Sequence, residues 1–204
     1  MPELREKVIQ SSLELFAEKG FHRVSVNEIV QHCGVSKGGF YHYFKSKDEL
    51  LYVIHDTFIT YVLEKAQLAV LNNTHPTYQL HAIIHSFVKV FDLYQLHISV
   101  FYQESIYLTS PFEERIKEKR DRFKDLLLAV IKNGQQQDQF RTDLPPQIAT
   151  MSILGMVNWT YKWYSRDGEK SIDEIADYFY EFISRALLPE DFIMLRNEEL
   201  NAKL

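Results

Sequence analysis

The stretch VSKGGFYHYFKSKDEL, from Val35 to Leu50, decides how this sequence of 204 residues folds. It combines two glycines with a run of aromatic residues, a histidine and three lysines. Glycine is a poor helix former, and neighbouring aromatic side chains are hard to bury together. The stretch is therefore either an irregular piece of core or a segment whose side chains point outward to a partner.

The residues around this stretch predict two short helices, 26–32 and 37–43, on either side of the break CGVS. Gly34 can adopt the positive φ that a tight turn needs, and Ser36 suits the N-cap of the second helix. Phe40 and Phe44 are spaced to face inward, as an i, i+4 pair. The positions of the second helix that we expect to be exposed are Lys37, Gly38, Gly39, Tyr41 and His42.

A helix of this kind can enter the major groove of DNA, which is about 12 Å wide. Small residues near its start allow the backbone to approach closely, and Lys37 can reach a base edge or a phosphate. Tyr41 and His42 can donate hydrogen bonds to phosphate oxygens. Lys47, in the first turn of the next helix, fits a phosphate anchor. The pattern predicts a helix-turn-helix that binds DNA.

The segment from about residue 4 to 61 resembles the DNA-binding domain of the TetR/AcrR family of bacterial transcriptional regulators. The resemblance rests on SSLELFAEKGFHRVSVNEIVQHCGVSKGGFYHYFKSKDELL, residues 11–51. It implies a helix-turn-helix over Val24 to Tyr43, within a DNA-binding domain at 1–61. A helical domain for ligand binding and dimerisation would follow at 62–204.

The resemblance also assigns residues to the DNA, by their match to positions that commonly contact DNA in the family. Together with the capping Ser36, these are Ser25, Asn27, Lys37, Gly38, Gly39, Tyr41, His42, Tyr43 and Lys47. Gly39 departs from the Thr, Ala or Ser that is commoner at its position. That departure leaves Lys37 as the main candidate for reading the base sequence.

The whole chain is predicted to be all-α, with about nine helices. Glycine and proline are scarce, at seven and six residues, and they fall between periodic segments. Four stretches, SVNE, SKDE, SPFE and SIDE, fit the capping box that opens a helix. The helices are expected at about 3–19, 26–32, 37–43, 47–71, 76–93, 96–107, 111–133 (ended by Gly134), 145–165 and 172–188, with 189–204 as a tail.

Composition excludes several classes of protein. The apolar fraction of 46% and charged fraction of 25% are ordinary for a globular chain. The net charge of −5 lies in residues 51–204, because the charges of residues 1–50 sum to zero. The N-terminal part of the chain is therefore the part that repels a polyanion such as DNA least. The single cysteine, Cys33, excludes an internal disulfide and suits the cytoplasm. With no apolar run of about 18 residues and no signal peptide, we expect no membrane association.

The last two predicted helices suggest a homodimer. In the family these helices usually form a four-helix bundle with the partner subunit. A palindromic DNA site also needs two recognition helices, and one monomer supplies only one. The residues expected at the dimer interface are Met151, Gly155, Ile175, Phe179, Phe182 and Ile183.

The middle helices are rich in aromatic residues, which fits an apolar pocket with a few polar groups. The expected lining is Phe91, Tyr94, Phe101, Tyr102, Glu104, Tyr107, Asn158, Trp159 and Trp163. Two effector classes fit. A cationic drug would need Glu104 or Asp92 beside aromatic faces. A fatty acyl-CoA would need a dry tunnel and cations for its phosphates, which the six cations of Arg115–Lys124 offer unless that run is a solvated face. GMVNWTYKWY and FRTDLPP are similar to acyl-CoA-responsive family members, which favours the second class.

The alternatives to a ligand-controlled regulator, most simply a repressor, are weaker. An all-helical enzyme would need a motif such as HExxH, a nucleophile elbow or a phosphate loop, and the sequence has none. His81 and His85 are four residues apart but have no evident third metal ligand. We therefore expect no catalytic residues, no metal and no cofactor. A DNA-binding adaptor without a ligand would not need so aromatic a second half.

Overall fold

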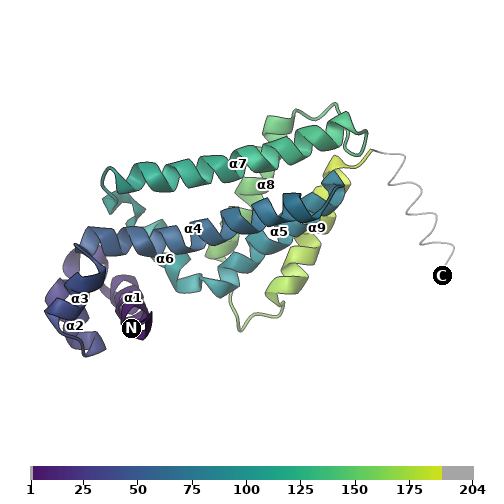
Figure 1. Cartoon of the computed structure of the whole chain (residues 1–204). Coiled ribbons are helices and arrows are strands. Elements are labelled where there is room, and N and C mark those ends of the chain that lie inside the picture. Colours follow the sequence, from purple (N-terminus) through teal and green to yellow (C-terminus); the bar gives the residue numbers. More distant parts are fainter. Residues whose placement is uncertain (1, 190–204) are drawn as a thin grey trace. The chain divides into compact units, whose positions relative to one another are not determined.

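The computed structural model describes residues 2–189, which are helical almost throughout and contain no strand (Figure 1). This confirms the predicted all-α fold. The α-helices are α1 (Pro2–Lys19), α2 (Val26–Cys33), α3 (Lys37–Tyr43), α4 (Lys47–Asn72), α5 (Pro76–Leu93), α6 (Gln95–Glu104), α7 (Phe112–Gln136), α8 (Pro146–Asn158) and α9 (Ile172–Leu187). The 3-10 helices are η1 (Phe21–Arg23), η2 (Ser105–Tyr107) and η3 (Trp159–Lys162).

The predicted ends of three helices were wrong. Two α-helices stop early, at Glu104 and Asn158, and their last predicted turns are the 3-10 helices η2 and η3. Gly134 does not end α7, which continues to Gln136. The glycine at position 134 instead leaves room for a neighbouring side chain, because a Cβ there would lie 2.0 Å from Cδ2 of Phe140. The predicted tail falls mostly on 190–204, outside the described residues.

Of the four predicted capping boxes, only SIDE is complete. Ser171 Oγ accepts the N–H of Glu174, whose carboxylate accepts the N–H of Ser171 at 2.9 Å. In SVNE and SKDE the serine caps its helix, but the glutamate carboxylate binds elsewhere. The capping box predicted for SPFE was wrong, because α7 begins at Phe112 and Ser110 Oγ donates to the Glu114 carboxylate instead.

Contacts divide the described chain into two compact units. Unit 1 comprises residues 2–61 and 94–120, and unit 2 comprises 62–93 and 121–189. Helices α4 and α7 each contribute residues to both units. This division differs from the boundary expected after residue 61, because 94–120 groups with the N-terminal helices.

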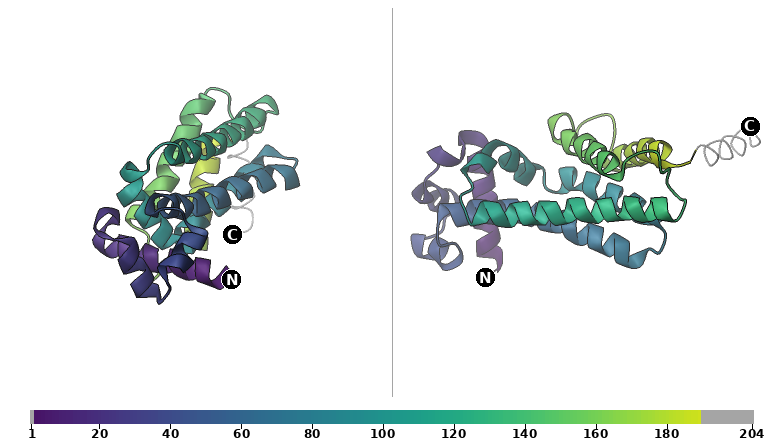
Figure 2. Two further views of the ribbon diagram at one scale, coloured as in Figure 1. Left: turned by 60° about the vertical axis from the view of Figure 1, so that its left-hand side comes forward. Right: turned by 90° about the horizontal axis from the view of Figure 1, so that it is seen from above.

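Unit 1 contains a small core shared by α1, α2 and α3, which all contact one another (Figure 2). Leu13 and Phe16 of α1 are buried there with Ile29 of α2. Phe40 of α3 is fully buried, and Phe44, which follows α3, is 1% exposed. The inward orientation predicted for these two phenylalanines is therefore confirmed.

In unit 2, the main packing is between α5 and α9, which lie side by side (Figure 1). The buried stripe of α9 includes Ile175, Ile183 and Leu187, and α5 buries Ile83 and Ile84. The three α9 residues recur at the i, i+4 and i, i+8 spacing of one helix face. The chain therefore uses one side of α9 for its own core and leaves the other side outward.

Candidate nucleic-acid interface

The turn between α2 and α3 has the predicted geometry. Gly34 adopts the left-handed conformation with φ 69°, and Val35 N–H donates to the Val30 carbonyl at 2.9 Å. Ser36 Oγ then accepts the N–H of Gly39 at 3.0 Å and caps α3. A left-handed residue followed by an N-cap fixes where α3 begins.

The outer face of α3 carries Lys37, Gly38, Tyr41 and His42, all exposed. Tyr41 is 52% exposed, while its ring stands edge-on to Phe40 at 5.2 Å between centroids. His42 likewise stands edge-on to the half-buried Tyr43, at 4.7 Å. The helix is thus anchored by buried phenylalanines and presents a lysine, a phenol and an imidazole to solvent.

Gly39 lies differently from its neighbours. It is half-buried, and a Cβ at this position would lie 3.5 Å from both Leu4 Cδ2 and Ser36 Oγ. The missing side chain therefore points towards α1 and not away from the protein. The glycine does not remove a side chain from the outer face of α3, and an alanine would fit with ordinary contacts.

Helix α2 presents Ser25 and Asn27 to solvent at its start. Ser25 Oγ accepts the N–H of Glu28 at 3.2 Å, and so caps the helix. The Glu28 carboxylate accepts a hydrogen bond from Lys19 Nζ at 2.6 Å, which lowers its pKa. Ser25 therefore has a structural role that a DNA contact would have to share.

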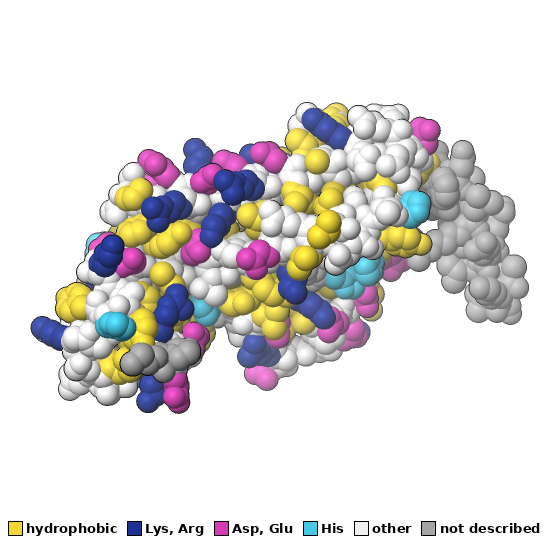
Figure 3. Space-filling view, in the orientation of Figure 1, with side chains coloured by type: hydrophobic (Ala, Val, Ile, Leu, Met, Phe, Trp, Pro, Cys, Tyr) yellow, Lys and Arg dark blue, Asp and Glu magenta, His cyan; other side chains and the backbone are white. Residues whose placement is uncertain are grey.

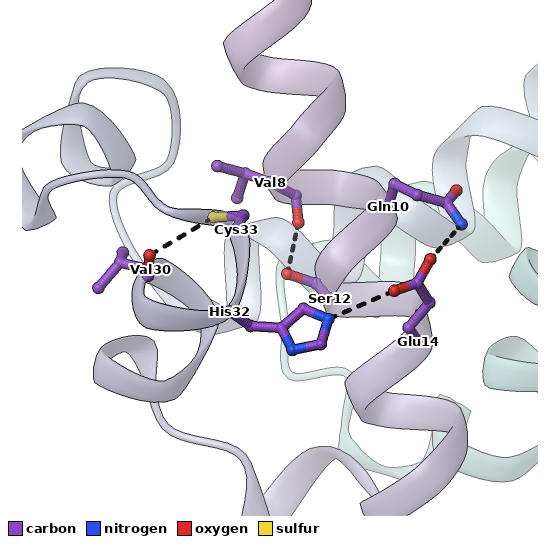
Figure 4. Close-up of polar contacts among 7 residues, drawn as sticks. All are labelled: Val8, Gln10, Ser12, Glu14, Val30, His32 and Cys33. Atoms are coloured by element: carbon purple, nitrogen blue, oxygen red, sulfur yellow. Dashed lines mark hydrogen bonds and ion pairs between the residues drawn. The ribbon is translucent and has the colours of Figure 1, made fainter.

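Figure 4 shows a polar contact that joins α1 to α2. Glu14 Oε2 lies 3.4 Å from His32 Nε2, and Glu14 Oε1 accepts a hydrogen bond from Gln10 at 2.9 Å. These two hydrogen bonds, with that of Gln10 the larger, lower the pKa of Glu14. The contact between Glu14 and His32 helps to hold α2, and hence the turn, on α1, while the bond from Gln10 lies within α1.

Lys47 was predicted to reach DNA as a phosphate anchor, but its side chain turns back into unit 1. Its Nζ donates to the carbonyl oxygens of Phe21 at 2.7 Å and Val24 at 2.8 Å. Burial lowers its pKa. The ammonium group is thus used inside unit 1, where it satisfies two carbonyls of η1 and the chain just after it, and the assignment as a phosphate anchor is corrected.

Two exposed cations near the turn were not among the predicted residues. Arg23 lies at the end of η1, two residues before the capping Ser25, and Lys45 lies between α3 and α4. Lysine and arginine side chains project at the α2–α3 end of the face drawn in Figure 3. The sequence does contain a signal for these two residues: each is a cation that lies close to a helix-capping serine but outside the α-helices.

The residues predicted to line a pocket fall in both units. Phe91, Asn158, Trp159 and Trp163 belong to unit 2, and the other five belong to unit 1. Trp159 is 60% exposed and Trp163 48% exposed, so neither is enclosed by the described chain. Phe101 and Glu104 are buried in unit 1.

Three of the charged groups proposed for an effector, Asp92, Lys119 and Lys124, are engaged in ion pairs. Asp92 accepts hydrogen bonds from Tyr164 at 2.7 Å and Arg166 at 2.8 Å. Burial raises the pKa of Asp92, but these two hydrogen bonds outweigh it and the net shift is downward. In the cationic run of α7, Lys119 binds Asp56 at 2.6 Å and Lys124 binds Asp121 at 2.8 Å.

The predicted dimer residues separate by burial. Met151 is 57% and Phe182 65% exposed, Gly155 is exposed, and Phe179 is half-buried. Ile175 and Ile183 were predicted at the dimer interface, but the chain's own core buries them. Further exposed apolar side chains on α8, η3 and α9 are Ile148, Trp159 and Tyr178. We call Ile148, Met151, Trp159, Tyr178 and Phe182 the α8–α9 apolar set.

Two features of the described residues bear on other kinds of site. Among them, no group of three or more His, Cys, Asp or Glu side chains is placed to hold a metal ion. None of the described helices combines the length and apolarity that crossing a bilayer requires.

Unit 1 thus has the features of a helix-turn-helix protein that binds DNA. Two family models match the chain: "Bacterial regulatory proteins, tetR family" over residues 8–53 and "Tetracyclin repressor-like, C-terminal domain" over 73–187. The second match covers more than half of the chain. The chain belongs to the TetR family of bacterial regulatory proteins. It is a DNA-binding transcriptional regulator and not an enzyme, as the sequence predicted.

Individual relatives agree with this assignment. The transcriptional repressor KstR2 of Rhodococcus jostii is 22% identical over 182 residues, which cover 88% of each chain. The solved structure of PfmR from Thermus thermophilus, a TetR family regulator, is 27% identical with a TM-score of 0.81, over 89% of this chain and 99% of that one. AibR, solved with isovaleryl coenzyme A and operator DNA, shares the fold at 24% identity and a TM-score of 0.75, over 88% of this chain and 97% of that one.

Proposed function

We propose that this protein is a repressor that binds a palindromic operator as a homodimer and leaves it when a hydrophobic effector binds. The observation that carries the proposal is the outer face of α3, where Lys37, Tyr41 and His42 are exposed above the buried Phe40. A helix with this arrangement can insert into a major groove without losing its own core packing.

Within this proposal the residues have different tasks. Lys37 reads a base edge, and Tyr41 and His42 donate to phosphates, with Asn27 and Ser25 of α2 at the neighbouring backbone. Arg23 and Lys45 take the phosphate role that had been given to Lys47. Contacts to phosphate set affinity and its salt dependence, whereas only contacts to base edges discriminate between sequences.

The α8–α9 apolar set supports the homodimer. Its five side chains are each more than half exposed in the single chain, which is costly unless a partner covers them. On α8 and η3, Met151, Gly155 and Trp159 recur every four residues, and on α9 Tyr178 and Phe182 do the same. Gly155 would let a partner helix approach closely, since no described heavy atom lies within 4 Å of a Cβ built there.

For the effector, the proposal favours a fatty acyl-CoA over a cationic drug. A cationic compound would need an available carboxylate. Asp92 already binds Arg166 and Tyr164, which leaves only the buried Glu104 of the two carboxylates considered. Arg115 and Arg120 lie over the rings of Tyr52 and Phe101 in unit 1 and can receive an anionic group. The same fold holds isovaleryl coenzyme A in AibR.

The proposal also divides the chain by function. Residues 1–61 bind DNA, and residues 62–204 bind the effector and form the dimer. It places the protein in the cytoplasm.

A mobility-shift assay tests the proposal. Purified dimer is titrated onto promoter DNA from its own genomic neighbourhood, at low salt, with and without micromolar long-chain acyl-CoA. The proposal expects a specific complex that acyl-CoA dissociates. Failure to bind any palindrome in that DNA would refute the regulator assignment, and a complex that no acyl-CoA dissociates would refute the effector class.

A further inference from the structure

One buried histidine in unit 1 has no evident structural task. His55 occupies the inward side of α4, in series with Leu51, Phe58 and Val62, all of which are apolar and buried. Its side chain is fully buried, at 0% exposure. Neither ring nitrogen has a hydrogen-bond partner among the described residues. An imidazole thus stands where the helix pattern calls for a leucine.

Such an arrangement costs stability. A neutral imidazole carries one donor and one acceptor, and buried polar groups in proteins nearly always have partners. The backbone of Val100 is near enough to act to raise the pKa of His55, but no group of the described chain meets the geometry of a hydrogen bond with either ring nitrogen. An unmet group in this position is therefore a candidate for a contact with a bound molecule.

The surroundings of His55 define what that molecule must be like. Phe101 stands edge-on to His55 at 5.0 Å between ring centroids, and Phe58 stands edge-on to Phe101 at 5.2 Å. Burial lowers the pKa of His55 to about 3 and that of His97 to about 4, so both rings are neutral near pH 7. The site is aromatic and uncharged, and it suits a neutral polar group on an apolar molecule.

A positive charge also lies near the Phe101 ring. The guanidinium carbon of the exposed Arg120 is 5.9 Å from the centroid of Phe101. Phe101 therefore neighbours both a buried neutral imidazole and a cation at the surface. A ligand that satisfies both would have a carbonyl in its apolar part and a negative charge further along.

We propose that His55 is the polar contact of an effector site within unit 1, where its ring donates a hydrogen bond to the carbonyl oxygen of an acyl thioester whose anionic end lies near Arg120. This inference rests on the proposed effector-responsive function and identifies the group that the protein recognises. Because His55 is fully enclosed, the ligand enters by displacing neighbouring side chains. His55 is eight residues from Lys47 on α4, about 12 Å along the helix, so a shift of α4 at the ligand acts on the contacts of Lys47 with Phe21 and Val24.

Calorimetric titration of the DNA-free protein can test the contact atom by atom. The probes are octanoyl-coenzyme A, S-octyl-coenzyme A, which is a thioether without the carbonyl oxygen, and free coenzyme A. The variants are His55→Phe and Arg120→Gln, with His81→Phe as a matched control at an exposed histidine of unit 2. Thermal unfolding establishes that each variant is folded. Nitrogen chemical shifts of the His55 ring in the wild type give a readout that needs no substitution at this residue.

The wild type should bind octanoyl-coenzyme A about tenfold more tightly than the thioether, as expected for one buried hydrogen bond. His55→Phe should remove this preference, Arg120→Gln should weaken both probes equally, and His81→Phe should change nothing. Binding of the thioester should also shift the His55 ring resonances.

A preference for the thioester that survives in His55→Phe would overturn the assignment, as would equal binding of both probes by the wild type or no binding of either. The unmet nitrogens would then belong to an internal water site. The mobility-shift assay measures operator binding and its release by acyl-CoA separately. Release that persists without a His55-dependent thioester preference would refute only the His55 contact, whereas a complex that acyl-CoA never dissociates would refute the effector class itself.

Discussion

Lys47 and Phe21 are joined twice: Lys47 Nζ donates to the Phe21 carbonyl at 2.7 Å and lies 4.1 Å from the centroid of the Phe21 ring. The same ammonium group donates to Val24. Helix α4 thus begins at a residue that fastens η1, the segment leading into α2. Burial lowers the pKa of Lys47, which indicates a lysine that serves the protein's own structure.

Lys47→Met should therefore reduce stability. It leaves two carbonyl oxygens without their donor, and we expect the free energy of unfolding to fall by about 1–3 kcal/mol. Urea denaturation measures this change. Lys45→Met, at an exposed position two residues away, should stay within about 0.5 kcal/mol of wild type. Lys45→Met should instead reduce by about one the slope of the logarithm of the DNA-binding constant against the logarithm of salt concentration. If Lys47→Met changed the salt dependence and Lys45→Met reduced the stability, Lys47 would again be the phosphate anchor.

The sequence was sufficient to predict the helix-turn-helix, because its constraints are local. A glycine with positive φ, capping serines and inward phenylalanines act within a few residues of one another. The task of Lys47 was not predictable in this way. Its partners are 23 and 26 residues earlier in the chain, so the pattern showed an exposed cation where the fold places a bonded one.

Gly134 offers a test of packing in unit 2. Alanine is the better helix former by about 1 kcal/mol. However, its Cβ would lie 2.0 Å from the ring of Phe140, which is only 2% exposed and has little room to move. We expect Gly134→Ala to lose a net of about 2 kcal/mol of stability, since overpacking outweighs helix propensity.

The matched control for that variant is Gly155→Ala, in α8, where the new methyl meets no described atom within 4 Å. Its effect on monomer stability should be neutral or favourable by up to about 1 kcal/mol. Thermal unfolding of both variants measures the difference. If the two glycines respond alike, Phe140 does not pack on α7 as described.

Stability should also depend on pH through His55. Its pKa falls from 6.5 to about 3 on folding, because burial disfavours the charged ring. Below pH 6.5 the unfolded chain takes up a proton that the folded chain refuses, so stability is complete above this pH and decreases towards pH 3. His97, with a pKa lowered to about 4, acts in the same direction.

We expect His55 alone to make the protein roughly 2 kcal/mol less stable at pH 5 than at pH 7. Unfolding curves at the two pH values measure this loss, and His55→Phe should remove its share. An equal dependence on pH in the wild type and the variant would show that His55 can protonate in the folded state.

The α8–α9 apolar set predicts which substitution separates the subunits. Phe182 is 65% exposed in the single chain, and Phe182→Asp should place a charge in the dimer interface. We expect monomers by light scattering at micromolar concentration. Leu71→Asp is a suitable control, because Leu71 on α4 is 79% exposed but outside this set. A dimer that withstands Phe182→Asp would place the interface elsewhere.

The sequence could not separate the two sides of α9. Ile175, Phe179, Phe182 and Ile183 share one broad apolar stripe, and periodicity alone gives its width but not which part faces α5. The structure assigns Ile175 and Ile183 to the core and leaves Phe182 outward. The pocket was harder still, because its predicted residues come from both units and their grouping depends on tertiary contacts.

If α3 reads DNA through Lys37, replacing this residue should weaken binding to the operator more than binding to unrelated DNA. Binding of the wild type and Lys37→Ala is measured by fluorescence anisotropy, at fixed salt, on the palindrome from the protein's own promoter and on a scrambled duplex. The account predicts that the variant loses about 1–3 kcal/mol on the palindrome and much less on the scrambled duplex. An equal loss on both duplexes, or none, would contradict the assignment of α3 as the recognition helix.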